Sequence, residues 1–219
     1  MLEQEITSIK KRIIEYAALV EKMIEKSTQG LVDKNEETLR QIIDKDEPQA
    51  NNWEIDIEEQ TTIILAKYQP TAKDLRIILM VSKMNNDLER MADHAVNIAE
   101  GSLYLIEKPT VKPLIDLPRM AKTTKKMLED SIDSFVKEDS KLAKSVCERD
   151  PQIDGLKDQI LRELITYMIS DPATIERSIR LIQITSSLER IADLSTNICE
   201  DVIFIVEGRV IKHHKEEQQ

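Results

Sequence analysis

One segment of this chain occurs twice. Residues 87–100, DLERMADHAVNIAE, return as residues 187–200, SLERIADLSTNICE, with Leu, Glu, Arg, Ala, Asp, Asn, Ile and Glu in register. A second stretch, EPQANNW at residues 47–53, matches DPQIDGL at residues 150–156. Two segments that recur in the same order at nearly the same spacing indicate an internal duplication. We therefore expect the two halves of the chain to share one fold.

The composition predicts an all-α protein. Of the 219 residues, 33% are charged, only 3% are aromatic, and 4 are glycine. Such a chain is poor in strand and turn formers and rich in residues that favour helices. The formal net charge of −10 argues against general nucleic-acid binding, which needs a basic surface. It permits the binding of cations.

The sequence carries no signal for secretion or membrane insertion. It begins MLEQE, which is acidic where a signal peptide is basic. No apolar run approaches the ~20 residues that a membrane helix needs. Cys147 and Cys199 fall in different expected helices and match no metal-ligand spacing, so we interpret them as small buried side chains in a reducing compartment. We predict a cytoplasmic protein whose contact with any membrane runs through a partner.

Apolar residues at steps of three and four predict three helical stretches in each half. In the first half they cover about 3–27, 33–68 and, after Pro70, the chain to about residue 106. In the second half they cover about 117–136, 139–169 and, after Pro172, the chain to about residue 207. Gly30 and Gly208 should end helices. Pro48 and Pro151 should kink or restart the middle helix of each half.

The two halves meet at a proline-rich link. Residues 108–118, KPTVKPLIDLP, hold three prolines, and proline lacks the amide hydrogen that a helix interior requires. We expect two tandem three-helix bundles related by duplication, over residues 1–109 and 110–208. The remaining residues, 209–219, should form a flexible tail.

The repeated helix carries an apolar stripe and a separate set of carboxylates. The stripe consists of Leu88, Met91, Ala95, Ile98 and Ala99, and of Leu188, Ile191, Ile198 and Val202 in the second copy. On a helical wheel the carboxylates of each copy fall within about 40° of one another, with an asparagine beside them. These residues are Glu89, Asp93, Glu100 and Asn97, and Glu189, Asp193, Glu200 and Asn197. We predict that they face outward, away from the bundle core.

Carboxylates four residues apart on a helix lie ~5–6 Å from each other and repel. Arg90 and Arg190 are one step away and offset the repulsion only in part. A bound cation would remove it, and all-oxygen clusters suit Ca²⁺, Mg²⁺, Mn²⁺ or iron. A solvated acidic surface is the alternative interpretation, because a duplication also retains residues passively.

The middle helix of each half offers further ligands. If it packs antiparallel to the repeated helix, Asp150 and Asp154 could face the carboxylates of the second copy. The equivalent residues of the first half are Glu47 and Asn51. Because one carboxylate is replaced by an amide, we expect a weaker or differently occupied first site. His94 has Leu194 as its counterpart, which argues against a ligand role.

The sequence favours a binding protein over an enzyme. It contains no Glu-x-x-His motif of the di-iron bundles, no Gly-rich phosphate loop and no Ser/His/Asp arrangement. With 3 histidines, a histidine-based mechanism has little to work with. A metal-dependent enzyme, for example a phosphatase, and a plain helical scaffold are the alternatives.

Four features together closely resemble the PhoU family of phosphate-transport accessory and regulatory proteins, over essentially the whole chain. They are the repeated Leu-Glu-Arg-x-Ala-Asp…Asn-Ile-x-Glu motif, Asp-Pro-Gln-Ile-Asp, QPTAKDLR at residues 69–76 and DVIFIVEG at residues 201–208. The resemblance implies two three-helix bundles. It also implies surface metal binding through Glu/Asp-x-x-x-Asp pairs, here Glu89/Asp93 and Glu189/Asp193, with Asp150/Asp154 facing the latter. The ion could be iron, zinc, manganese, magnesium or calcium.

Two features depart from the family pattern. Glu47/Asn51 lacks the second carboxylate, and Ala92 and Ala192 stand where glycine is common. The resemblance further implies a negative regulator of phosphate uptake that links the ATPase subunit of a phosphate ABC transporter to a sensor histidine kinase. Many family members form homodimers. Regulation of another transporter is the alternative within this class.

Overall fold

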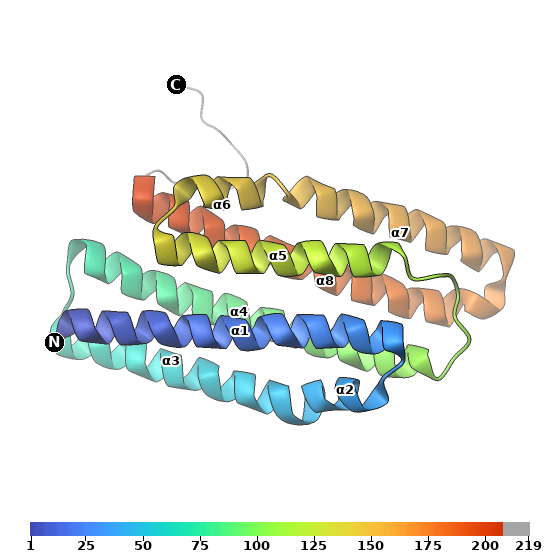
Figure 1. The fold of residues 1–219 in the computed structure, drawn as a ribbon, viewed down its shortest axis with the longest axis horizontal. Helices are drawn as coiled ribbons and strands as arrows, with labels where there is room; N and C mark the ends of the chain where they lie inside the picture. Colours follow the sequence, from blue (N-terminus) through green and yellow to red (C-terminus); the bar gives the residue numbers. More distant parts are fainter. Residues whose placement is uncertain (208–219) are drawn as a thin grey trace, which may run out of the picture.

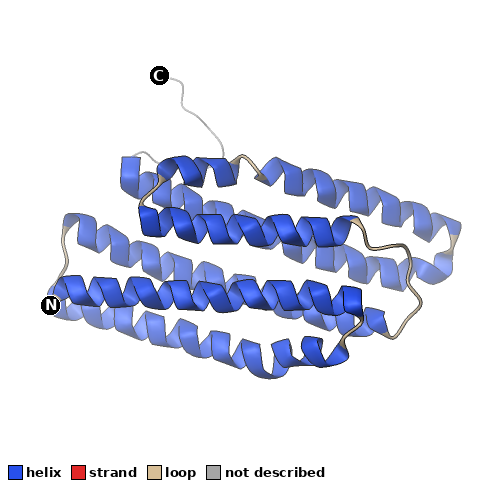
Figure 2. Ribbon diagram, viewed as in Figure 1, coloured by secondary structure: helices blue, strands red, loops and turns tan. Residues whose placement is uncertain are grey.

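The computed structural model describes residues 1–207, and every regular element within them is a helix (Figure 2). The first half contains α1 (Leu2–Asp33), α2 (Glu36–Gln41), α3 (Glu47–Tyr68) and α4 (Ala72–Ile106). The second half contains α5 (Asp116–Lys137), α6 (Ser140–Cys147), α7 (Asp150–Ser170) and α8 (Ile175–Glu207). A π-helical turn over Ile42–Asp46 precedes α3, and a 3₁₀ turn over Pro172–Thr174 precedes α8. The predicted fold class is confirmed.

The long helices form two bundles that lie side by side (Figure 1). Helices α1, α3 and α4 pack together in the first, and α5, α7 and α8 in the second. Between the bundles, α4 packs along α8 and α1 packs along α5. The repeated helix of each copy therefore lies at the centre of the molecule.

The predicted apolar stripes build this centre. All their residues are buried on α4 and α8, and burying one Leu or Ile side chain stabilises the fold by about 1.5–3 kcal/mol. Gly101 lies where α4 meets α8, and a Cβ atom there would stand 3.2 Å from Cγ1 of Ile184. The missing side chain lets the two helices approach closely.

The prediction that Gly30 ends the first helix is wrong. Helix α1 continues to Asp33, and Lys34 caps it in the left-handed conformation with φ 52°. A Cβ atom on Gly30 would lie only 2.7 Å from Cδ2 of Leu39, a buried residue of α2. Glycine is therefore needed here for a close contact between helices, and the turn itself is made by another residue.

The middle helix is interrupted at the predicted place in both halves, but in two different ways. In the first half the chain stays helical through the π turn that ends just before Glu47. In the second half α6 stops at Cys147 and α7 starts at Asp150 after a short turn. Pro48 and Pro151 each sit in the first turn of the helix that follows, where no amide donor is required.

The link between the halves, residues 107–115, contains no regular helix. Its Lys112 is buried and forms an ion pair with Glu163 of α7, which fixes the link to the second bundle. Gly208 and the tail 209–219 lie outside the described residues. No helix within residues 1–207 is long and apolar enough to cross a membrane.

Candidate functional site

The first carboxylate group lies where α3 packs on α4 and consists of Glu47, Glu54, Glu89, Asp93 and Glu100. Burial raises the pKa of Glu89, and the negative charges of Asp93 and Glu54 raise it further. Burial also raises the pKa of Glu47, with added repulsion from Asp93 and Glu100. Among residues 1–207, none of these five carboxylates forms an ion pair, that is, none has a Lys or Arg nitrogen within 4.0 Å of its oxygens. The group is a patch of negative charge that the more distant Arg90 offsets in part.

A buried tyrosine lies against this group. Tyr16 of α1 is fully buried, and its hydroxyl has no hydrogen-bond partner among the described residues. Its pKa is raised well above the usual value, first by burial and then by the charges of Glu89, Glu54 and Asp93. The group therefore has a protein-covered side as well as a solvent-facing side.

The second carboxylate group lies where α7 packs on α8 and consists of Asp150, Asp154, Glu189 and Asp193. Burial raises the pKa of Asp193 to about 6, and Glu189, Asp150 and Asp154 add to the shift while Arg190 opposes it. The expectation that the α7 pair faces the α8 carboxylates is confirmed.

Basic side chains partly neutralise the second group. Nζ of Lys157 lies 2.8 Å from Oε1 of Glu189. Arg190 reaches both carboxylates of α8, with Nε 3.8 Å from Glu189 Oε2 and Nη1 3.6 Å from Asp193 Oδ2. Charge balance thus differs between the two groups although the residues of α4 and α8 recur.

The prediction of an outward carboxylate face is only partly right. Asp93 and Glu100 are exposed, but only 13% of the Glu189 side chain is exposed because α7 covers it. Glu89 is likewise half-buried. Glu89 lies between α4 and α3, and Glu189 lies between α8 and α7, because α3 and α7 each extend past the edge of the apolar stripe.

Glu54 is the residue that sequence comparison missed. The comparison paired Glu47 with Asp150 and exposed Asn51 with Asp154, and it ended at residue 53. One residue further, Glu54 aligns with Lys157. An acid in the first half thus stands where the second half has a base, and this position faces the repeated helix in both.

The remaining predicted residues lie near these groups. A cleft of about 620 Å³ between α4 and α8 is lined by His94, Asn97 and Glu100, among others. Burial and the charge of Arg90 lower the pKa of His94, and its buried Nδ1 has no hydrogen-bond partner among the described residues. Asn197 is exposed, and Arg90 lies 4.0 Å from Asp87.

The prediction that both cysteines are buried holds for Cys199, whereas Cys147 is only half-buried. Their side chains share a hydrogen bond where α6 packs on α8. That bond lowers the pKa of Cys147 and, together with burial, raises the pKa of Cys199. Half-buried Glu200 lies close enough to Cys147 to act on its pKa.

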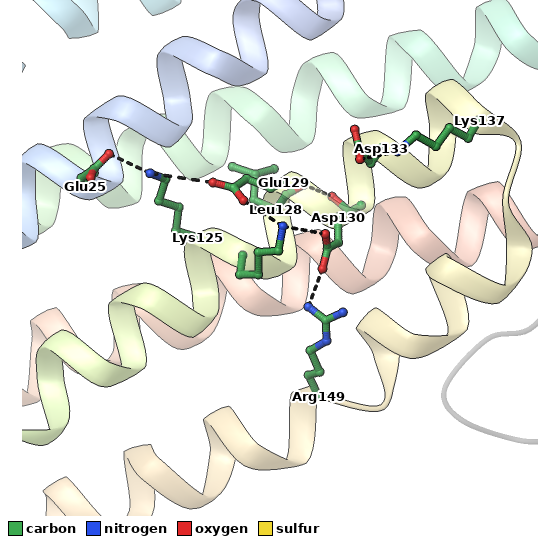
Figure 3. Close-up of polar contacts among 10 residues, drawn as sticks. Glu25, Lys125, Leu128, Glu129, Asp130, Asp133, Lys137 and Arg149 are labelled. Atoms are coloured by element: carbon green, nitrogen blue, oxygen red, sulfur yellow. Dashed lines mark hydrogen bonds and ion pairs between the residues drawn. The ribbon is translucent and has the colours of Figure 1, made fainter.

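A chain of ion pairs joins the first bundle to the start of α7 (Figure 3). It runs through Glu25, Lys125, Glu129, Lys126, Asp130 and Arg149. Arg149 donates to Asp130 at 2.6 Å, and Lys126 lies 3.0 Å from the same carboxylate. Burial alone would raise the pKa of Asp130, but the hydrogen bonds from Arg149 and Lys126 lower it. Because Arg149 precedes Asp150, this chain fixes where α7 begins.

The fit of these groups to a metal ion can be judged from their donors. Both consist of hard oxygen ligands, which suit Mg²⁺, Mn²⁺, Ca²⁺ or iron. As arranged, however, no three Asp, Glu, His or Cys side chains within residues 1–207 converge closely enough to hold one ion. An ion would therefore take its ligands from carboxylate pairs and water, or would draw exposed side chains inward.

Comparison with protein families gives two matches in this chain. A model described as the PhoU domain matches residues 13–101 and again residues 117–202. Each match covers one bundle and includes its repeated helix.

Curated relatives match over nearly the whole chain. A protein of Aquifex aeolicus named phosphate-specific transport system accessory protein PhoU homolog is 40% identical over 212 residues, covering 97% of this chain and 96% of the relative. The homolog of Pseudomonas aeruginosa is 34% identical, and the protein of Escherichia coli is 30% identical. Each of these two alignments covers 95% of this chain and 86% of the relative.

Two solved structures also match over nearly the whole chain. The crystal structure of PhoU from Pseudomonas aeruginosa has a TM-score of 0.92 at 33% identity, covering 95% of this chain and 100% of that one. The phosphate transport system regulatory protein PhoU from Streptococcus pneumoniae has a TM-score of 0.89 at 28% identity, covering 97% and 100%.

Proposed function

This chain belongs to the PhoU family, and from this membership we propose that it is an accessory, regulatory protein of a phosphate transport system. The observation that carries the proposal is the near-full-length likeness to relatives named for that role. Those relatives are named as accessory proteins and not as enzymes. We expect the protein to act in the cytoplasm and to associate with the membrane only through partner proteins.

The finer proposal is that the protein restrains phosphate uptake when phosphate is plentiful. It would do so as an adaptor between the ATPase subunit of a phosphate ABC transporter and a sensor histidine kinase, acting as a homodimer. The acidic surface, with a formal net charge of −10, suits docking to basic surfaces on such partners.

Deleting the gene tests the role. In phosphate-rich medium, the deletion should raise phosphate uptake and switch on phosphate-starvation genes, and the wild-type gene should reverse both. Unchanged phosphate uptake with altered uptake of another ion would instead assign the protein to a different transporter.

Affinity purification tests the partners. A tagged chain taken from phosphate-replete cells should recover the transporter ATPase and the kinase, and light scattering should give the mass of a dimer. Recovery of neither protein, from cells shown to contain both, would contradict the adaptor role.

We also propose that each carboxylate group binds a metal ion. What supports this is that burial, and after it repulsion from neighbouring carboxylates, raises the pKa of Glu47, Glu89 and Asp193. A bound cation would favour the charged form of each carboxylate and relieve the repulsion. When bound, the ion would supply positive charge that joins the repeated helix to its neighbour. Glu89 and Asp93 of α4 would bind the ion of the first group, and Glu189 and Asp193 of α8 would bind the ion of the second.

Equilibrium dialysis against Mn²⁺ tests the metal proposal. Glu89→Ala with Asp93→Ala, or Glu189→Ala with Asp193→Ala, should each remove one group's binding and leave the helical circular dichroism unchanged. A matched control is Glu58→Ala with Glu59→Ala, because these exposed carboxylates of α3 belong to neither group. Equal loss in the control, or no binding by the wild type, would refute the sites.

A further inference from the structure

The two cysteines of this chain meet at the break in the second bundle. Cys147 is the last residue of α6, and Cys199 is fully buried on α8. A hydrogen bond joins their side chains, and neither is in a disulfide. Since Cys147 is half-buried and Cys199 fully buried, Cys147 is the more accessible residue of the pair.

The position of Cys147 at a helix end allows the pair to close. A disulfide brings its sulfurs to ~2.05 Å, which is shorter than any hydrogen bond, so one side chain must move inward. Cys147 is followed by the short turn that separates α6 from α7, and helix ends yield more easily than helix interiors. Cys199, in the middle of α8, can stay in place.

We propose that Cys147 and Cys199 form a reversible intramolecular disulfide when the protein meets a hydroperoxide, and that this bond ties the end of α6, just before the start of α7, to α8. The Cys147 thiolate attacks the O–O bond, which yields a Cys147 sulfenic acid and releases an alcohol or water. The Cys199 sulfur then attacks the sulfenic sulfur, and the thiol proton leaves with the hydroxyl group as water. Two thiols lose two electrons in total, and the peroxide gains them.

The disulfide would act on one bundle only. With Glu47 aligned to Asp150, the counterpart of Cys147 is Asp44, and the counterpart of Cys199 is Ala99. Asp150, the first residue of α7, comes soon after Cys147 in the sequence, and Glu200 is adjacent to Cys199. The bond would therefore restrict the α7–α8 seam that holds the second carboxylate group and leave the first group free.

Peroxide titration of the reduced, metal-free full chain tests this inference independently of the metal sites. Iodoacetamide labelling and peptide mass spectrometry should find a Cys147–Cys199 cross-link within single chains, and dithiothreitol should restore both thiols. The folded chain should form it about tenfold faster than the chain in guanidinium, because the fold already holds the sulfurs together.

Two variants complete the test. Cys199→Ser should stop at a Cys147 sulfenic acid, which dimedone traps, and Cys147→Ser should leave Cys199 resistant to peroxide. If the wild type forms only disulfides between chains, or only a sulfinic acid at Cys147, the inference is wrong. It is equally wrong if both thiols of the folded chain remain open to alkylation after peroxide treatment.

Discussion

The carboxylates of α4 and α8 are copies of one pattern, but the helices that cover them carry opposite charges at one position. In the first bundle α3 presents Glu54 toward Glu89, and in the second α7 presents Lys157, 2.8 Å from Glu189. On sequence alone, Asn51 made the first half the weaker candidate for a metal site. The charges favour the reverse, because the first group has no basic neighbour within ion-pair distance in residues 1–207. A repeated motif therefore does not define a site until its packing partner is known.

The apolar stripes should prove equivalent where the carboxylates do not. Leu88 and Leu188 occupy matching positions and are both fully buried. Replacing either with alanine should lower the free energy of unfolding by about 2–5 kcal/mol, with similar values for the two. Urea denaturation of both variants measures this. A large difference between them would show that the two bundles are packed differently.

Exchanging the charged residues of the covering helices should reverse the comparison. Lys157→Glu removes the closest partner of the largely buried Glu189, leaves only the longer contact with Arg190 and adds a like charge, so we expect about 2 kcal/mol lower stability. Glu54→Lys should stabilise by about 0.5–1 kcal/mol, because it removes a repulsion at a more solvated place. Lys157→Met is the control that keeps the packing of the aliphatic stem. If Lys157→Glu is no worse than Lys157→Met, the added charge has no effect.

The same exchange should redistribute metal affinity. If Mn²⁺ binds both groups, Glu54→Lys should weaken binding to the first about tenfold, and Lys157→Glu should strengthen binding to the second by a similar factor, since affinity follows ligand charge. Calorimetric titration with Mn²⁺ on each variant measures both constants. An unchanged affinity of the first group would mean that Glu54 lies outside its site.

Asp193 should make the second bundle sensitive to acid in a defined direction. Burial and the neighbouring carboxylates raise its pKa from the usual 3.8 to about 6 in the folded protein, so the folded state binds the proton more tightly than the unfolded state. The carboxylate therefore costs stability above pH 6, and this cost disappears as the pH falls toward 4. Asp193→Asn should stabilise the protein by about 1 kcal/mol at neutral pH, a value reduced for solvent screening, and by almost nothing at low pH. Thermal unfolding across this pH range measures the difference, and a constant gain at every pH would exclude this cause.

The parts that sequence could predict are those set by a residue's own helix. The period of apolar residues reports which face of α4 or α8 is buried, so the core and the interruptions at Pro48 and Pro151 were predictable. A helical wheel cannot show how far a neighbouring helix extends, so the burial of Glu189 under α7 was not. Glu54 was missed because the alignment ended one residue too early.

Contacts between distant segments account for the remaining differences. From sequence, Gly30 was predicted to end the first helix. Its actual role is to allow close packing of Leu39, and that contact is visible only in the folded structure. The cysteine pair depends on where α6 ends relative to α8, which no local pattern encodes.

The seams between the bundles differ in the forces that close them. Along α4 and α8 the contact is mainly apolar and is close at Gly101, and one ion pair, between exposed Lys83 and half-buried Asp201, crosses it. Along α1 and α5, ion pairs such as Lys125–Glu25 bridge the bundles, and half-buried Glu21 has a pKa of about 7, raised by burial and then by Glu129. Salt screens the charges of the second seam and has less effect on the largely apolar first seam. A small pH change near neutrality alters the charge within the second seam. Ionic conditions therefore act mainly on the α1–α5 seam, while the largely apolar α4–α8 contact holds the two halves together.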